Sequence, residues 1–416
     1  MNRLTGVRAI MKDIGEALLS PDAKRYCNLS AGNPLVIPEV ENLWRDLMRD
    51  LLSAPEYGNV ICRYGMTQGY EPLIRAVVTY FNKEYGLALT DKNVLITPGS
   101  QSLYFFASNC FGGYDNAGKL KKIVLPLSPD YTGYGGVSIA PEAVVSYRPE
   151  IEIAKTPHRF KYHPNFKALQ IDEETGCVIF SRPTNPTGNV VTDEEVRQIA
   201  ALAAKVNAPV FIDSAYGPPF PALNFTEMTP IFAPNVVHCM TLSKAGLAGE
   251  RVGIAIGDAK ILEALECFES NSMIHSSRLG QAIVARAIES GALQQLSTSI
   301  IRPFYRKKLT ILEEAFDRYM PANVPWYLHL GEGSIFAWVW FDELPISDSE
   351  LYLQCKKAGV ILVPGNAFFP GLQGTWQHTE QCLRLSLTAS DEHLSEGVRR
   401  LAGVVESAYR STEKRA

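Results

Sequence analysis

Short apolar runs rich in β-branched residues recur through the middle of the chain. Seven such runs lie at 94–97, 123–127, 144–147, 178–181, 210–213, 236–242 and 252–256. Segments with helical spacing separate several of them, as at 193–206 behind the candidate N-cap Thr192. Because buried parallel strands read as continuous apolar stretches and need helices on both faces, the pattern predicts an α/β fold whose large domain holds a mostly parallel seven-stranded sheet.

The two ends of the chain predict a second, smaller block. The elements expected after Gly257 are a long amphipathic helix at 301–319, a strand pair at 334–341 and 360–363, and a final helix at 391–409. The first 45 residues carry apolar positions with helical spacing at 4–18, and such a helix needs an apolar partner. We therefore expect residues 46–295 to form the large domain, and residues 1–45 with 296–416 to form a smaller α+β domain.

Composition and charge exclude several classes of protein. Of the 416 residues, 46% are hydrophobic and 20% are charged, and the net charge is −4. A slightly acidic chain has no broad electrostatic attraction for nucleic acid or anionic membranes. No apolar run approaches the ~18–20 residues needed to span a bilayer, and the first residues lack a signal-peptide layout, so we expect a cytoplasmic protein. The eight cysteines form no C-x-x-C pair, which predicts free thiols and no metal site.

Polar groups gather where the predicted strands end. In an open α/β sheet, ligands bind beyond the carboxyl ends of the strands. The segments found there are Thr97-Pro98-Gly99-Ser100-Gln101, Asn185-Pro186-Thr187-Gly188, Asp213-Ser214-Ala215-Tyr216 and Thr241-Leu242-Ser243-Lys244, with Gly249 and Arg251 beyond. Taken singly, each has an ordinary reading as a turn, a helix cap or a surface side chain. Together, and each at a strand end, they indicate one binding site.

The collected groups suit pyridoxal phosphate. This cofactor needs a lysine with which to form a Schiff base, here Lys244. It needs a carboxylate beside its ring nitrogen, which Asp213 can supply, and hydrogen-bond donors to its ring oxygen. Its phosphate needs a helix N-terminus and a fixed positive charge, and Gly99 and Arg251 stand in positions to provide them. The sequence therefore predicts a pyridoxal 5'-phosphate enzyme.

The order of these motifs, followed later by Arg384, resembles the fold-type I aminotransferases of class I and II. The resemblance extends from about Asn28 to the C-terminal helix. The wording of residues 241–251 is most similar to the bacterial valine–pyruvate aminotransferases. The resemblance implies the fold-type I architecture and pyridoxal 5'-phosphate as cofactor. It also implies transamination of a neutral aliphatic L-amino acid with a 2-oxo acid, namely valine and pyruvate giving 3-methyl-2-oxobutanoate and alanine.

The resemblance also assigns roles to residues of this sequence. Lys244 would be the catalytic residue, which binds the cofactor and then moves the proton at the substrate Cα. The ring would be held by Tyr131, Asn185, Asp213 and Tyr216. The phosphate would be held by Gly99, Ser100, Gln101, Thr241 or Ser243, Arg251 and, from the neighbouring subunit, Tyr64. The substrate would be bound by Gly32, Asn185 and Arg384, whose planar guanidinium fork suits a carboxylate.

The resemblance further implies a homodimer with shared active sites. In the aspartate-specific relatives an arginine of the second subunit binds the substrate side chain, but the comparable stretch here, 268–275, has no arginine or lysine. This favours a neutral substrate. An aminotransferase of aromatic, 2-aminoadipate or alanine–glutamate specificity, or a β-lyase, would use the same motifs. A cofactor-sensing regulator is disfavoured, because only about 27 residues precede the matching region and the chain is not basic.

Overall fold

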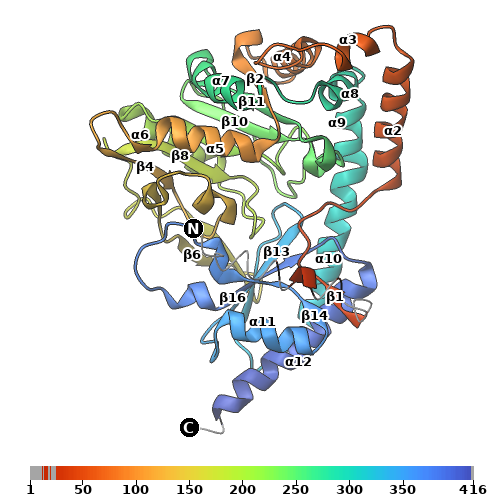
Figure 1. Cartoon of the computed structure of the whole chain (residues 1–416). Coiled ribbons are helices and arrows are strands. Elements are labelled where there is room, and N and C mark those ends of the chain that lie inside the picture. Colours follow the sequence, from red (N-terminus) through yellow and green to blue (C-terminus); the bar gives the residue numbers. More distant parts are fainter. Residues whose placement is uncertain (1–11, 13, 17–18, 20–24, 414–416) are drawn as a thin grey trace.

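Two sheets organise the molecule, one in the upper part of Figure 1 and one in the lower part. The computed structural model describes residues 12, 14–16, 19 and 25–413. The helix expected at 4–18 lies largely outside these residues. The long helix α10 (Arg302–Tyr319) confirms the helix predicted at 301–319. It runs from the upper part to the lower part in Figure 1. The site described below lies between the two sheets.

The upper sheet contains all seven predicted strands. Its order is β2-β11-β10-β9-β8-β4-β3, and β5 pairs with β4. The strands are β2 (Val94–Thr97), β3 (Gly113–Tyr114), β4 (Leu120–Leu125), β5 (Val144–Ser146), β8 (Thr175–Ser181), β9 (Val210–Asp213), β10 (Val236–Thr241) and β11 (Gly253–Ile256). Strands β5, β4, β8, β9 and β10 pair in parallel, and β11 runs antiparallel to its two neighbours. The eighth strand, β3, is a two-residue addition antiparallel to β4.

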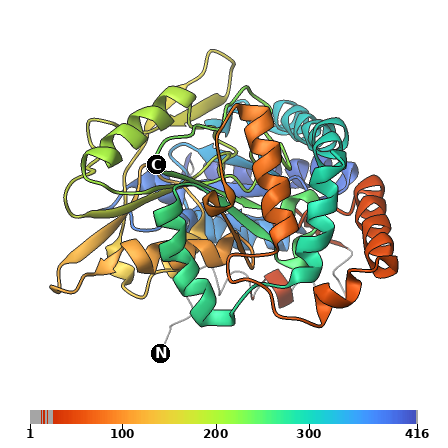
Figure 2. The same ribbon diagram turned by 90° about the horizontal axis from the view of Figure 1, so that it is seen from above.

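Helices cover both faces of this sheet, as the continuous apolar strands require (Figure 2). Successive residues of one strand point to opposite faces, so Val210 and Ile212 belong to one buried cluster and Phe211 to the other. One face packs against α5 (Ser100–Phe111) and α7 (Ala259–Met273), and the other against α4 (Glu71–Tyr85), α6 (Asp193–Lys205) and α8 (Arg278–Glu289). Thr192 caps α6 in a capping box with Glu195, which confirms the predicted start.

The lower sheet corrects one prediction about strand pairing. Its order is β15-β16-β13-β12-β7-β6, formed by β6 (Glu150–Ile153), β7 (Arg159–His163), β12 (Trp326–His329), β13 (Phe336–Phe341), β15 (Val363–Pro364) and β16 (Cys382–Ser386). The runs at 334–341 and 360–363 do not pair with each other. The second run divides into β14 (Val360–Ile361), which pairs with β1 (Cys27–Asn28), and β15, which pairs with β16. An apolar run shows that a strand is buried but not which backbone satisfies its hydrogen bonds.

The same sheet also takes two strands from the middle of the chain. Strands β6 and β7 lie within the range 46–295 expected for the large domain, yet β7 pairs in parallel with β12. The remaining helices are α2 (Pro38–Ser53), α3 (Tyr57–Ile61), α9 (Ala292–Leu296), the π-helical turn at Ser297–Ile301, α11 (Asp348–Lys357) and α12 (Asp391–Glu413). Helix α12 confirms the expected final helix. No helix within the described ranges combines the length and the apolar character that crossing a bilayer requires.

Helix α2 fastens the N-terminal segment to the loop that follows β10. The indole Nε1 of Trp44 donates a buried hydrogen bond to the Ala245 carbonyl at 2.9 Å. A side chain at Gly246 would meet Val40 at 2.5 Å, so the close approach of α2 requires glycine there. This contact brings residues 30–35, which precede α2, next to the carboxyl ends of the large sheet.

Candidate active site

Lys244 lies at the carboxyl end of β10, beside the N-terminal segment. It follows β10 in a short 3-10 turn, and its Nζ donates to the Gly32 carbonyl at 2.7 Å. Its Nζ also lies 5.9 Å from the centre of the Tyr216 ring. Burial and the positive charge of Arg384 together outweigh the opposing effect of Asp213 and lower the pKa of Lys244 to about 8. Lys244 is therefore poised near neutrality to act as a nucleophile or a base.

Asp213 is a buried carboxylate at the end of β9. Its Oδ2 accepts from the Tyr134 hydroxyl at 2.8 Å, and its Oδ1 accepts from the Ala215 amide at 2.9 Å. Burial raises the pKa of Asp213, while nearby Tyr104 and Tyr134 oppose the rise. These supports are neutral donors, and no salt bridge to Asp213 forms within the described chain. The carboxylate is thus available to a cation that enters the cleft, such as a protonated ring nitrogen.

The turn after β2 forms an anion cradle with the loop after β10. Gly99 has φ +89° and precedes α5, whose first residues are Ser100 and Gln101. A Cβ on Gly99 would stand 2.3 Å from Nη2 of Arg251, so the guanidinium packs directly over the backbone of this turn. Free amides at a helix start, together with an arginine, are suited to a phosphate group.

Two hydroxyl groups complete the wall around Arg251. Its Nη1 donates to the Ser243 hydroxyl at 3.1 Å and to the Ala248 carbonyl at 3.1 Å. The Thr241 hydroxyl lies 3.0 Å from that of Ser243. The predicted phosphate residues from two separate loops are therefore brought together in one place.

Arg384 enters the cleft from the lower sheet. Its Nη1 donates to Asn185 Oδ1 at 3.0 Å, and its Nη2 donates to the Ser30 carbonyl at 3.1 Å. Its Nε is buried and has no partner among the described residues. Burial lowers the pKa of Arg384 to about 10, so it stays charged at neutral pH. The guanidinium can therefore receive a carboxylate, and the amide Nδ2 of Asn185 is left to donate elsewhere.

Tyr131 and Tyr216 supply the aromatic surfaces of the cleft. The Tyr131 hydroxyl donates to Gln101 Oε1 at 3.1 Å, which ties the ring to the start of α5. Asp130 anchors the preceding turn, because its Oδ2 accepts from the Ser181 amide at 3.1 Å. Tyr216 is buried, and burial raises its pKa, so its hydroxyl remains a donor at neutral pH.

Tyr64 is the one predicted site residue that the structure does not bring to this cluster. Its side chain is 82% exposed, and its ring meets His275 edge-on at 5.9 Å. Three supporting residues escaped the sequence analysis, namely Ser30, Tyr104 and Tyr134. No local signal distinguishes these from other polar or aromatic residues, because only the fold carries them to Arg384 and Asp213.

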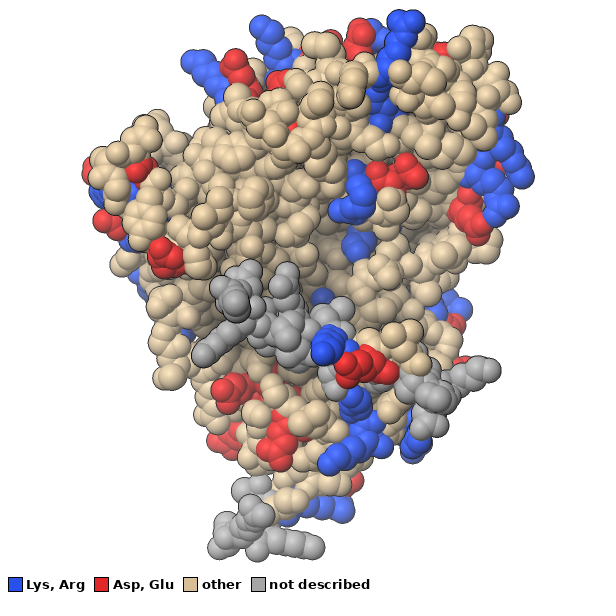
Figure 3. Space-filling view, in the orientation of Figure 1, with Lys and Arg blue, Asp and Glu red and all other residues tan. Residues whose placement is uncertain are grey.

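Two views place the cleft relative to the rest of the surface. Figure 3 shows basic side chains inside the recess between the upper and lower parts of this face.

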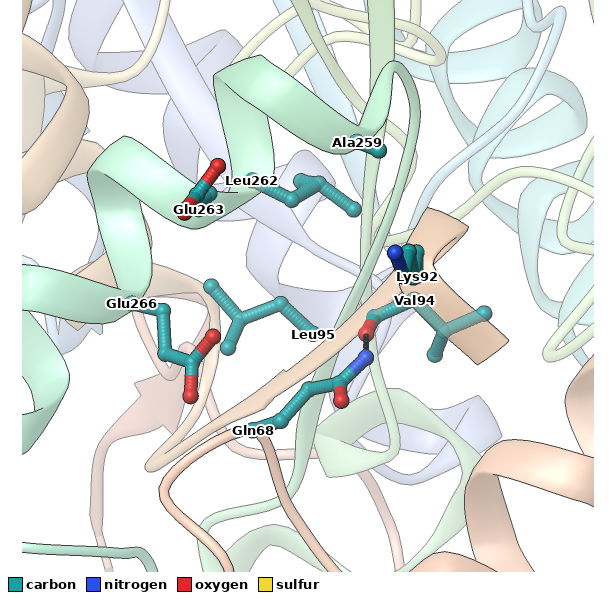
Figure 4. A pocket seen from close by; sticks show the side chains of 8 residues that line it. All are labelled: Gln68, Lys92, Val94, Leu95, Ala259, Leu262, Glu263 and Glu266. Atoms are coloured by element: carbon teal, nitrogen blue, oxygen red, sulfur yellow. Dashed lines mark hydrogen bonds between the residues drawn. The ribbon is translucent and has the colours of Figure 1, made fainter. Parts of the chain in front are cut away.

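Figure 4 shows a separate hollow between β2 and α7, lined by Leu95 and Leu262 and bordered by Gln68 and Glu266. There the Gln68 amide donates to the Val94 carbonyl at 2.8 Å. The Thr67 hydroxyl donates to the Glu266 carboxylate nearby. None of the predicted site residues lines this hollow.

Most of the chain matches one family of enzymes. The family model described as "Aminotransferase class I and II" matches residues 25–401. The chain belongs to this family. The aminotransferase is 39% identical over 407 residues to the valine–pyruvate aminotransferase of Escherichia coli K12, with 98% of this chain and 96% of that protein covered.

Two solved structures are similar over nearly the full length. A putative amino-acid aminotransferase from Psychrobacter arcticum 273-4 gives a TM-score of 0.93 at 34% identity, and the match covers 98% of this chain and 97% of that one. A valine–pyruvate aminotransferase from Salmonella typhimurium LT2 gives a TM-score of 0.88 at 36% identity, covering 97% and 100%. The predicted fold-type I aminotransferase architecture is confirmed.

The residues present fit pyridoxal 5'-phosphate, which is the cofactor of this family. The buried Asp213 has no cationic partner in contact, Gly99 allows the Arg251 guanidinium an approach that a Cβ would block, and the amine of Lys244 has a lowered pKa. Each feature suits one part of the cofactor: the ring nitrogen, the phosphate and the aldehyde.

Gly99→Ala tests the anion cradle. The Cβ would strain a backbone conformation that favours glycine and would displace the Arg251 guanidinium, so we expect cofactor affinity to fall about tenfold or more. The measurement is the dissociation constant of pyridoxal phosphate by absorbance titration of the apoenzyme. Gly249→Ala is the matched control, since its Cβ would meet nothing within 4 Å. Equal affinities for both variants would contradict the cradle.

Tyr134→Phe tests the support of Asp213. The loss of this donor raises the pKa of Asp213, so the acidic limb of cofactor retention should move to higher pH. At neutral pH the cofactor should bind about 10- to 100-fold more weakly, because a hydrogen bond to a charged group is lost. Retention is measured by dialysis over a pH series. Tyr114→Phe, which removes an exposed hydroxyl from Glu142, should leave the profile unchanged.

Proposed function

We propose that this aminotransferase exchanges the amino group of L-valine for the oxo group of pyruvate, giving 3-methyl-2-oxobutanoate and L-alanine. The position of the Lys244 amine is the main structural support for this reaction. The amine lies beside the Tyr216 ring and interacts with the charges of Asp213 and Arg384. The choice of substrates is supported by the 39% identity to the Escherichia coli enzyme named valine–pyruvate aminotransferase. Pyridoxal phosphate, when bound, supplies a ring that withdraws electrons from the substrate Cα.

The chain's own residues then have distinct tasks. Lys244 removes the proton from the substrate Cα and returns it, because its amine has a pKa near the working pH. Asp213 holds a proton on the ring nitrogen through charge pairing in a buried setting. Asn185 and Tyr216 donate to the ring oxygen. The amides of 99–101, the hydroxyl groups of Thr241 and Ser243, and Arg251 hold the phosphate.

Arg384 binds the carboxylate that both substrates share. Valine, alanine and the two oxo acids all carry a carboxylate next to the reacting carbon, so one guanidinium serves both halves of the reaction. The Gly32 carbonyl accepts from Lys244, and the Ser30 carbonyl accepts from Arg384. Residues 30–35 are thereby placed to cover the bound substrate and exclude water.

We further propose a homodimer in which Tyr64 serves the partner's active site. An exposed apolar patch formed by Ile61, Tyr64, Met66, Met273 and Ile274 supports this, because a second copy would remove it from water. The edge contact between Tyr64 and His275 joins the two segments of the patch.

The substrate proposal is tested with a panel of amino acids against pyruvate. We expect kcat/KM for valine to exceed that for 2-aminoadipate at least tenfold, because no arginine or lysine in 268–275 can pair with a second carboxylate. Formation of alanine and the oxo acid is measured by chromatography, and ammonia release would indicate a lyase instead. Lys244→Ala should abolish turnover, and normal turnover in that variant would end the proposal.

The shared site is tested with mixed dimers. Tyr64→Phe alone should loosen the cofactor about tenfold, because one donor to the phosphate is lost. A heterodimer of Tyr64→Phe with Lys244→Ala then contains one intact site if Tyr64 acts across the interface, and should recover about half of the wild-type activity per dimer. If Tyr64 acts within its own subunit, no intact site exists. Recovery no better than Tyr64→Phe would contradict the shared site.

A further inference from the structure

Two phenylalanine rings enclose the guanidinium of Arg384. Its Cζ lies 4.1 Å from the centre of the Phe336 ring and 4.9 Å from that of Phe368. On β13, Trp338 pairs directly with Arg384, and Phe336 lies two residues before Trp338. Side chains two residues apart point to the same face of a sheet, so Phe336 and Arg384 share one face. Phe368 ends the turn after β15, the other neighbour of β16. The rings therefore approach Arg384 from both sides of its strand.

The groups that accept hydrogen bonds from Arg384 are neutral. Its hydrogen-bond partners are the Asn185 amide oxygen and the Ser30 carbonyl, and within the described chain it forms no salt bridge. Burial of such an unpaired cation is costly, and its pKa is lowered to about 10 as a result. A paired carboxylate would relieve this cost but would also occupy the donors that a substrate needs. The negative faces of aromatic rings attract the cation without using any N–H group.

We propose that Phe336 and Phe368 are positioning residues that keep Arg384 charged, oriented and free to bind a substrate carboxylate. The affinity of the enzyme for the amino acid and for the 2-oxo acid therefore depends on the electron density at the faces of the two phenylalanine rings. This rests on the proposed carboxylate-binding role of Arg384 and adds the means by which the guanidinium is held ready. Because both substrates use the same guanidinium, loss of the ring contribution affects both equally.

A simple packing role makes a different prediction. Phe368 also contacts the Trp338 ring at 5.9 Å, so removing it would disturb the core under any interpretation. Fluorination separates the two roles, since fluorine atoms withdraw electron density from the ring face while the ring keeps its shape. A packing role depends on shape, and a cation–π role depends on the charge of the face.

The experiment replaces Phe336 or Phe368 in the full-length holoenzyme with mono-, di- and trifluorophenylalanine by amber suppression. We expect KM for valine and KM for pyruvate to rise stepwise and by the same factor, reaching about 5- to 30-fold when the ring contribution is lost. The kcat should stay within twofold, because the rings touch the carboxylate site and not the transferred proton. Phe316, a buried ring on α10 that contacts Trp326, is the matched control and should give no trend.

A second measurement does not depend on turnover. 3-Methylbutanoate has the shape and carboxylate of valine but no amino or oxo group, so its inhibition constant reports the carboxylate site alone. This constant should follow the same fluorination series, whereas weak inhibition by the neutral 3-methylbutanamide should not. Flat KM and inhibition constants across the series at both rings would overturn the proposal and leave packing as the role of these residues.

Failure of the proposed function gives a separate result. If wild-type enzyme transaminates but Arg384→Ala leaves KM and the inhibition by 3-methylbutanoate unchanged, then Arg384 is not the carboxylate site, whatever the rings do. If Arg384→Ala raises both constants and the fluorinated series is flat, only the role of the rings is wrong. The fluorinated proteins keep the ring volume, so their folding can be checked against the Phe316 control.

Discussion

The cleft depends on the burial of charged groups that have no ion-pair partner within the described chain. Asp213, Lys244 and Arg384 lie between the two sheets, and in each case loss of water shifts the pKa toward the neutral form. Neutral groups offset part of the desolvation cost. Asp213 accepts hydrogen bonds from phenols, Lys244 donates to a carbonyl, and Arg384 contacts an amide, a carbonyl and two aromatic rings. The cost is relieved when groups of opposite charge enter, so the energy of burial favours binding and catalysis.

The three charged groups come from distant parts of the chain. Because two of them follow strands of the large sheet and the third lies in the other sheet, both sheets are needed to bring them together. Strand β9 ends in Asp213, the loop after β10 holds Lys244, and strand β16 of the lower sheet supplies Arg384. The N-terminal segment contacts the same groups through three hydrogen bonds. Trp44 donates to the Ala245 carbonyl, the Gly32 carbonyl accepts from Lys244, and the Ser30 carbonyl accepts from Arg384. In the proposed reaction, a substrate would lie between the cofactor held by the large sheet and a guanidinium carried by the other sheet.

Much of the candidate site could be predicted because apolar runs in the sequence show where strands end. Thr97 and Asp213 end their strands as the apolar runs predicted, and β10 ends at Thr241, one residue before the predicted end. Parallel strands bring their carboxyl ends to one edge of the sheet. The order of the motifs then indicated the family. Tyr134 and Tyr104 could not be found in this way, since an aromatic residue in a turn or on a helix carries no mark of the carboxylate beside it.

The sequence by itself determined the α/β class, seven of the eight strands of the large sheet and the residue types of the candidate cofactor site, because these depend on local periodicity and on residues at strand ends. Only the tertiary structure decided which strands pair in the lower sheet, where 360–363 divides between two partners. It also decided that Phe336 and Phe368 enclose Arg384. These features depend on contacts between segments far apart in the chain, and burial patterns record that a residue is inside without recording what it touches.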